Sequence, residues 1–175
     1  RFKDLFFALS HGVNFGKLKT RNLDDREIFL DSLIDRNKKF TFNILGYANE
    51  QPKWNYQFYK EIAKCKMALN LSRGRAMKYY SSNRIASLVA NGIMTFIDKK
   101  VGYSDFFDEN EMGFYKNVDD LLLQMDRLYS NIGKINQISK NGKRKYFSIF
   151  NNLIISDYII SKTFNKKGKF KYVWE

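Results

Sequence analysis

The sequence LNLSRGRAMKYYSSNRIASLVANGIMTFID, residues 69–98, contains two apolar runs separated by a basic, hydroxyl-rich loop and an amphipathic segment. The apolar run 67–71 predicts a buried strand, and the loop after it opens a helix that ends at Gly92. Three apolar residues of this helix share one face: Ile85, Leu88 and Val89. Residues 93–97 predict a second buried strand. The stretch is therefore a βαβ unit, whose ligands are expected at the carboxyl ends of its parallel strands.

The start of this helix suits an anionic ligand. Because the helix is expected to begin near Ser81 and Ser82, free backbone N–H groups, hydroxyls and the positive end of the helix dipole point toward the strand ends. Lys78 and Arg84 add full positive charges. The loop is therefore predicted to attract phosphate.

Short apolar runs alternate with helical patterns along the rest of the chain. Further strands are predicted at 4–9, 40–45 and 113–115, and further helices at 22–37, after Pro52, at 118–128, from Ile132 and at 150–161. Residues 10–16 predict a glycine loop, and the inner stripe of the first helix is predicted to be Leu30, Leu33 and Ile34. This alternation predicts an α/β fold, a Rossmann-like three-layer α/β/α domain with a parallel sheet of about five strands.

The length of 175 residues fits one domain, which we place at 1–164, followed by a basic and aromatic C-terminal tail at 165–175. The lysine-rich part of the tail, 165–171, is expected to be mobile. Four apolar or aromatic residues nevertheless predict that part of the tail docks: Phe170, Tyr172, Val173 and Trp174.

The net charge of +13 favours an anionic partner, which could be a nucleotide, a nucleic acid or a membrane surface. The bias toward Lys, Asn, Ile and Phe is equally typical of AT-rich coding DNA. Lone Cys65 excludes an internal disulfide and, with a single His, leaves too few ligands for a structural zinc site. No stretch reaches the roughly 20 apolar residues of a membrane helix. We therefore expect a soluble, cytoplasmic protein in a reducing compartment.

Several enzyme classes lack their motifs in this chain. There is no P-loop, no Gly-x-Gly-x-x-Gly and no Ser/His/Asp set, which argues against kinases, dehydrogenases and hydrolases. There is also no Asp-x-Asp pair of the kind that holds a metal. An RNA-binding domain would explain the lysine clusters at 140–145 and 165–171, but the chain has no aromatic strand motif of the RNP type.

The order and spacing of these motifs resemble the donor-binding C-terminal domain of GT-B glycosyltransferases, most closely the spore-maturation-protein type. The resemblance rests on residues 69–73 and 84–92, where the family helix reads approximately Arg-x-aromatic-Glu-Ala-x-Ala-x-Gly before a strand and an acidic residue. Further similar positions are Arg26, Gly46–Tyr47 and residues 115–121. The chain departs from the family at Ala86, in place of the aromatic residue, and at Ser87, in place of the acidic residue that holds the donor ribose.

The resemblance implies a glycosyltransferase that transfers a sugar from a nucleotide-diphosphate sugar to an acceptor, which could be a glycan, a lipid or a protein. The donor-binding candidates are Ser10, Gly12, Gly46, Tyr47, Arg73, Lys78, Tyr79, Ser81, Ser82, Arg84 and Ser87. The catalytic residue is unidentified, with His11 as a candidate, and neither a metal nor another cofactor is implied. For each candidate, a solvated charge, ordinary turn chemistry or core packing is the alternative role.

In the resembling proteins the cleft forms between two domains, so the expected partner is an N-terminal GT-B domain of the same protein. The chain begins at Arg1 without an initiator Met, and we expect these 175 residues alone to be inactive. Basic patches suggest contact with the inner face of a membrane, whereas nucleic acid is not favoured as a partner. Two alternatives remain open: a nucleotide-sugar-binding module inactivated by Ser87, and a basic RNA-binding domain.

Overall fold

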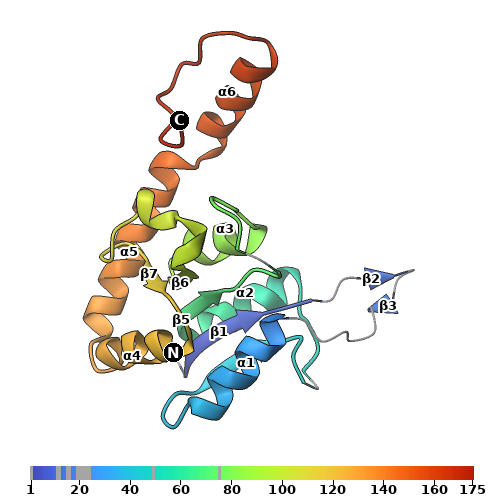
Figure 1. Cartoon of the computed structure of the whole chain (residues 1–175), viewed down its shortest axis with the longest axis vertical. Coiled ribbons are helices and arrows are strands. Elements are labelled where there is room, and N and C mark those ends of the chain that lie inside the picture. The colour runs from blue at the N-terminus through green and yellow to red at the C-terminus, as the bar shows by residue number, and fades with distance from the viewer. Residues whose placement is uncertain (1, 11–12, 15–16, 19–24, 49, 75) are drawn as a thin grey trace.

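A computed structural model describes residues 2–10, 13–14, 17–18, 25–48, 50–74 and 76–175. A five-stranded parallel sheet lies at its centre in the order β4-β1-β5-β6-β7 (Figure 1). The strands are β1 (Lys3–Ala8), β4 (Phe42–Leu45), β5 (Cys65–Asn70), β6 (Met94–Asp98) and β7 (Gly113–Tyr115). The predicted α/β fold with about five parallel strands is therefore confirmed.

Helices cover both faces of the sheet. Leu5 and Phe7 of β1 point into the core under α1 (Asp25–Arg36) and α4 (Val118–Tyr129). The first turns of α5 (Ile132–Ile149) pack against the same core. The intervening Phe6 points to the opposite face, under α2 (Asn55–Ala63) and α3 (Asn83–Ala90), as the period of two in a strand requires. These two cores produce the three predicted layers.

The remaining elements lie at the edges. Two 3-10 helices, η1 (Lys99–Val101) and η2 (Tyr103–Asp105), connect β6 to β7 and pack with α3 and the end of α5. The last helix, α6 (Asn152–Thr163), extends away from the rest of the molecule (Figure 1). The predicted glycine loop 10–16 contains the short strand β2 (Val13–Asn14), which pairs antiparallel with β3 (Lys17–Leu18) after the loop.

The inner face of α1 differs from the prediction. Leu30 and Leu33 are fully buried, but Ile34 is 37% exposed. The buried stripe continues through Arg26 and Glu27 toward the start of the helix. The apolar pattern could not show this, because the first turn of α1 directs polar side chains inward at the end of the sheet.

The strand order changes direction at the carboxyl ends of β1 and β5, and we call this place the crevice. From β1 the chain crosses through α1 to β4 on one side, and then through α2 to β5 on the other side of β1. Because α1 and α3 follow β1 and β5 on opposite faces, their N-terminal ends flank the gap between these strands. Open α/β sheets bind ligands at such a switch point.

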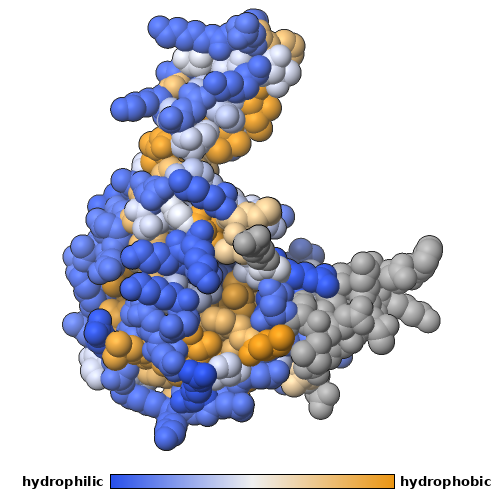
Figure 2. Space-filling view, in the orientation of Figure 1, coloured by the Kyte–Doolittle hydropathy of each residue, from blue (hydrophilic) through white to orange (hydrophobic). Residues whose placement is uncertain are grey.

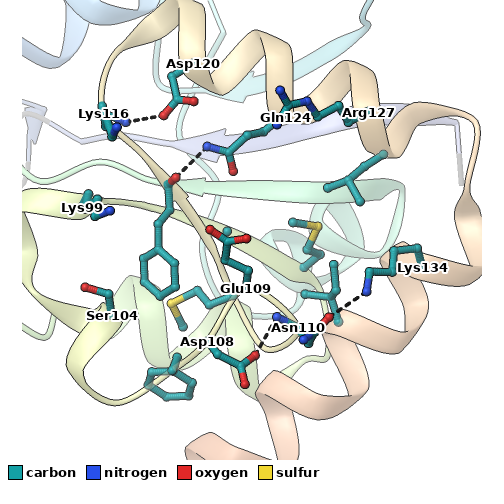
Figure 3. Close-up of a pocket in the computed structure, with 17 residues that line it drawn as sticks. Lys99, Ser104, Asp108, Glu109, Asn110, Lys116, Asp120, Gln124, Arg127 and Lys134 are labelled. Atoms are coloured by element: carbon teal, nitrogen blue, oxygen red, sulfur yellow. Dashed lines mark hydrogen bonds between the residues drawn. The ribbon is translucent and has the colours of Figure 1, made fainter.

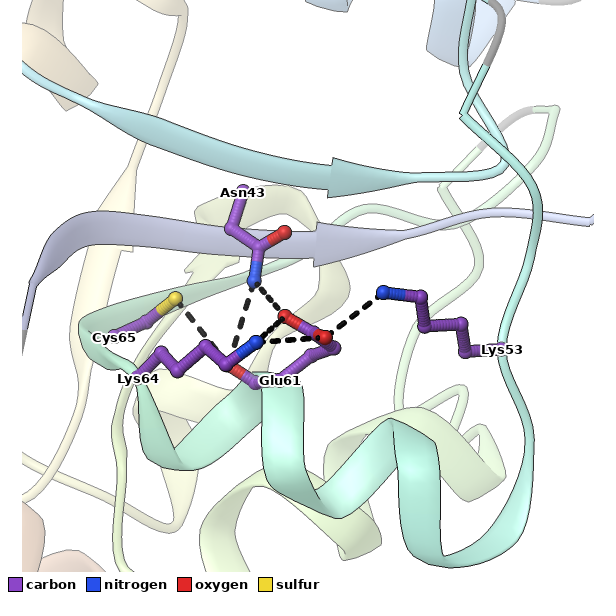
Figure 4. A network of polar contacts seen from close by, with 5 residues as sticks. All are labelled: Asn43, Lys53, Glu61, Lys64 and Cys65. Atoms are coloured by element: carbon purple, nitrogen blue, oxygen red, sulfur yellow. Dashed lines mark hydrogen bonds and ion pairs between the residues drawn. The ribbon is translucent and has the colours of Figure 1, made fainter.

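A buried carboxylate fixes the start of β5 to β4 (Figure 4). Glu61 of α2 accepts hydrogen bonds from Asn43 Nδ2 at 3.0 Å, Lys53 Nζ at 2.8 Å and Lys64 Nζ at 2.9 Å. Burial alone would raise the pKa of Glu61, but hydrogen bonds from the two lysines and Asn43 outweigh it and lower the pKa to about 2. The folded state therefore favours the ionised form.

We expect Glu61→Gln to be less stable than the wild type at pH 7 by roughly 2–3 kcal/mol. Because the folded pKa lies below the unfolded one, this contribution is present above about pH 4.5 and is lost as the pH falls toward about 2. Urea unfolding at a series of pH values should show the two proteins converging in acid. Glu109→Gln, at an exposed position, is the control, and a constant difference down to low pH would contradict the assignment.

Candidate functional site

Two arginines from opposite layers meet at the crevice between β1 and β5. Arg26 is the second residue of α1, is 5% exposed, and donates from Nη2 to the Ser10 carbonyl at 3.4 Å. Arg84 is the second residue of α3 and donates from Nη1 to the Leu71 carbonyl at 2.8 Å. Its guanidinium also lies 4.9 Å from the centre of the Phe7 ring. Backbone and ring contacts therefore hold two positive charges at the carboxyl ends of adjacent strands.

The charge on Arg84 is poorly compensated. Burial lowers its pKa, and repulsion from Arg26 lowers it further, to about 10. Arg84 is still a cation at neutral pH. Within the described ranges no carboxylate forms an ion pair with it. An anion placed between the two guanidinium groups would relieve their repulsion, and a phosphate could accept paired hydrogen bonds from each.

The N-terminus of α3 opens onto the same place. Ser82 is the N-cap residue, as predicted, but its hydroxyl makes no capping hydrogen bond. That hydroxyl instead donates to Oδ1 of the buried Asn70 at 3.4 Å, at the end of β5. The first-turn N–H groups beside Arg84 therefore lack a side-chain cap, and such groups are suited to anion binding.

Tyr115, the last residue of β7, is a further polar group close to Arg84. Sequence reasoning did not assign it to the site. It is 1% exposed, and its hydroxyl has no hydrogen-bond partner in the described part of the chain. Burial raises the pKa of Tyr115, with a further rise from Asp98, while Arg84 opposes it. The hydroxyl therefore stays protonated near Arg84. A tyrosine ending a short buried strand offers a weak sequence signal, because the pattern equally fits a core residue.

Lys78 and Tyr79 are directed elsewhere than predicted. The Tyr79 hydroxyl donates to Asp105 Oδ2 at 2.6 Å, and its ring lies 4.8 Å from that of Phe106. Lys78 Nζ lies 3.7 Å from Asp105. Tyr79 has a φ of +60°, which turns the chain toward the 3-10 segment. The structure thus attaches both side chains to residues 99–106.

Gly46 and Tyr47 have packing contacts. Gly46 has a φ of +75°, and a Cβ atom there would lie 2.0 Å from the Leu9 carbonyl oxygen. The Tyr47 hydroxyl donates to Asp31 of α1. These contacts account for both residues at the turn after β4.

The other predicted residues divide between the crevice and the surface. Ser10 follows β1, and its carbonyl faces Arg26; Ser87 is half-buried on α3, one turn after Arg84. Ser81 interacts with the hydroxyls of Tyr103 and Tyr146, and Arg73 is exposed in the loop after β5. His11 and Gly12 lie outside the described residues.

A separate cavity of about 610 Å³ lies beside β7 (Figure 3). Its wall carries charges of both signs, including Lys116 and Arg127 beside Asp108 and Asp120. None of the crevice residues in the described ranges lines it. Mixed charge makes this cavity a poorer phosphate site than the crevice.

The described residues offer neither a metal site nor a membrane-spanning helix. No group of three or more His, Cys, Asp or Glu side chains is arranged to hold a metal ion. None of the helices in those ranges has the length and apolar character needed to cross a bilayer.

The chain matches the pattern of a known protein family over most of its length. The pattern of a family described as glycosyl transferase-like matches residues 21–152, which include both arginines and the N-terminus of α3. Comparison with curated proteins finds no significant match.

Proposed function

Because the chain belongs to the glycosyl transferase-like family, we propose that the crevice between β1 and β5 binds the diphosphate of a nucleotide-sugar donor. The observation that carries the proposal is the pair Arg26 and Arg84, held at the switch point beside an uncapped helix N-terminus. A diphosphate supplies negative charge and oxygen acceptors, which suit guanidinium groups and the N–H groups of a helix N-terminus.

In the proposed reaction the sugar moves to a glycan, lipid or protein acceptor and the nucleoside diphosphate leaves. Negative charge develops on the leaving diphosphate as the glycosidic bond breaks. The guanidinium groups and the N–H groups of α3 would stabilise that charge without reorganising. Such electrostatic stabilisation of the transition state is usually the largest single contribution to an enzyme's rate enhancement. The proposal requires no metal. It places the acceptor on a second GT-B domain, so that these 175 residues bind donor without transferring sugar.

Calorimetry with UDP-, GDP- and ADP-linked sugars tests the proposal. We expect binding of at least one nucleotide-diphosphate sugar, weakened by salt, and no binding of the matching nucleoside without phosphates. Single-stranded RNA is the competing ligand. Failure of the whole panel, together with tight and strongly salt-dependent RNA binding, would replace the donor site by the nucleic-acid alternative.

A substitution at Ser87 tests whether the donor site is active or has lost tight binding of the donor. In the resembling family an acidic residue at this position holds the ribose, and a neutral hydroxyl forms a weaker hydrogen bond than a carboxylate. We expect Ser87→Glu to tighten donor binding roughly tenfold, equivalent to about 1.4 kcal/mol. Ser87→Gln, similar in size but uncharged, should give a smaller gain. Unchanged or weaker binding by Ser87→Glu would show that the ribose is held elsewhere.

A further inference from the structure

The C-terminal lobe, residues 152–175, is a projection built from α6 and the segment that folds back along it (Figure 1). Asp157 joins the two parts by accepting hydrogen bonds from the Lys169 N–H at 2.7 Å and the Tyr172 hydroxyl at 2.7 Å. Trp174 stacks on Phe150, with ring centres 5.6 Å apart. The predicted docking is confirmed for Tyr172 and Trp174, whereas Phe170 and Val173 stay exposed. The contacts of Tyr172 and Trp174 fix how the lobe presents its surface.

That surface exposes large apolar side chains. Leu153 is 66% exposed and Phe164 is 65% exposed. The other large apolar side chains that the lobe exposes are Ile159, Ile160, Phe170 and Val173. Figure 2 shows orange apolar surface on the lobe next to projecting blue side chains. So many exposed apolar groups on one small element are typical of a surface that something covers.

The end of the lobe combines this apolar surface with a cluster of positive charge. The loop 164–171 has the sequence Phe-Asn-Lys-Lys-Gly-Lys-Phe-Lys, with four lysines and no acidic residue. The lobe has two carboxylate side chains, and both are engaged: Asp157 binds the returning segment, and Glu175 pairs with Lys162 at 2.6 Å. None of the four loop lysines forms a close ion pair in the described part of the chain, although Lys169 attracts Asp157 over a longer distance. These lysines surround two exposed phenylalanines.

We infer that the C-terminal lobe docks on an anionic lipid bilayer. Phe164 and Phe170 insert at the boundary between head groups and acyl chains, and the four loop lysines bind lipid phosphates. Stable attachment to a bilayer needs two such contributions, apolar insertion and a basic cluster, and the loop supplies both. The exposed aliphatic side chains distinguish this surface from an RNA site, because Leu153 and Ile160 cannot stack on bases as aromatic residues do. The inference does not depend on donor binding at Arg84.

Vesicle flotation of the 175-residue protein tests this inference. We expect the protein to float with phosphatidylcholine vesicles that contain phosphatidylserine, and not with phosphatidylcholine alone. Phe164→Ser/Phe170→Ser and a variant with Gln at the four loop lysines should each lower the bound fraction at least about tenfold. The matched control replaces four exposed lysines of the body by Gln: Lys38, Lys99, Lys116 and Lys140. All altered side chains are exposed, and equal melting temperatures would establish that each variant is folded.

Three results would overturn the inference. The first is a larger loss of vesicle binding in the body-lysine control than in the loop-lysine variant, which would assign the attraction to general charge. The second is the absence of vesicle binding together with RNA binding that requires the loop lysines. The third is self-association that the phenylalanine variant abolishes, again without vesicle binding, which would make the lobe a contact between copies of this chain.

Discussion

Replacement of Arg84 by alanine is expected to weaken binding of a nucleotide-diphosphate sugar by about tenfold to a hundredfold, because a hydrogen bond to a charged group contributes about 1.5–3 kcal/mol. The guanidinium is already positioned by the Leu71 carbonyl and the Phe7 ring, so little side-chain entropy is lost when an anion binds. Its loss would also leave Arg26 as the single arginine among the described crevice residues. Calorimetry with the tightest donor of the panel measures the effect.

Arg84→Lys separates charge from geometry. A lysine keeps the positive charge but has a single nitrogen in place of the planar fork, so it cannot form a paired contact with phosphate from one side while another nitrogen holds Leu71. We expect an intermediate loss. Arg127→Ala is the matched control, because Arg127 is exposed on the wall of the cavity beside β7. A greater loss from Arg127→Ala than from Arg84→Ala would move the donor site to that cavity.

The sheet could be predicted because its strands are continuous apolar runs. Runs such as 67–71 must be buried on both faces, and the helical segments between them require parallel crossovers. The short β2–β3 pair was not predictable, since strands of two residues are too short for an apolar run or an alternating pattern to mark them. The hydrophobic periodicity of the sequence therefore predicts the strands and helices of the three layers better than it predicts the loops that connect them.

The candidate site was predicted in part, for a physical reason. Arg84 and Ser82 could be placed because they start the helix that follows β5 in the βαβ unit, where topology determines position. Arg26 was identified only as a position similar to the family, and the sequence pattern did not predict its burial. A charged residue in the first turn of a helix is ordinarily solvated. Lys78 and Tyr79 have the chemistry of a donor site, but a positive φ and Asp105 direct them to the 3-10 segment. Such tertiary contacts cannot be read from local sequence.

Gly46→Ala is expected to have the largest effect on stability, a loss of about 2–5 kcal/mol. The φ of +75° costs a residue with a side chain about 1–2 kcal/mol. The new methyl group would also lie 2.0 Å from the Leu9 carbonyl oxygen, and overpacking of this kind typically costs about 1–3 kcal/mol. The carbonyl cannot move freely, because Leu9 N–H donates to Leu45 at 3.0 Å and thereby ties β1 to β4.

Gly74→Ala is the matched control, because Gly74 has a similar φ of +72° but no heavy atom within 4 Å of the added Cβ. Urea unfolding should show a loss of about 1–2 kcal/mol for Gly74→Ala, which carries only the backbone cost. A displaced Leu9 would also shift Ser10, whose carbonyl holds Arg26, so Gly46→Ala should weaken donor binding as a consequence of its instability. Equal losses in the two variants would show that the Leu9 contact relaxes without cost. Weak donor binding by a fully stable Gly46→Ala protein would instead assign Gly46 a direct contact with the donor, as the family resemblance implies.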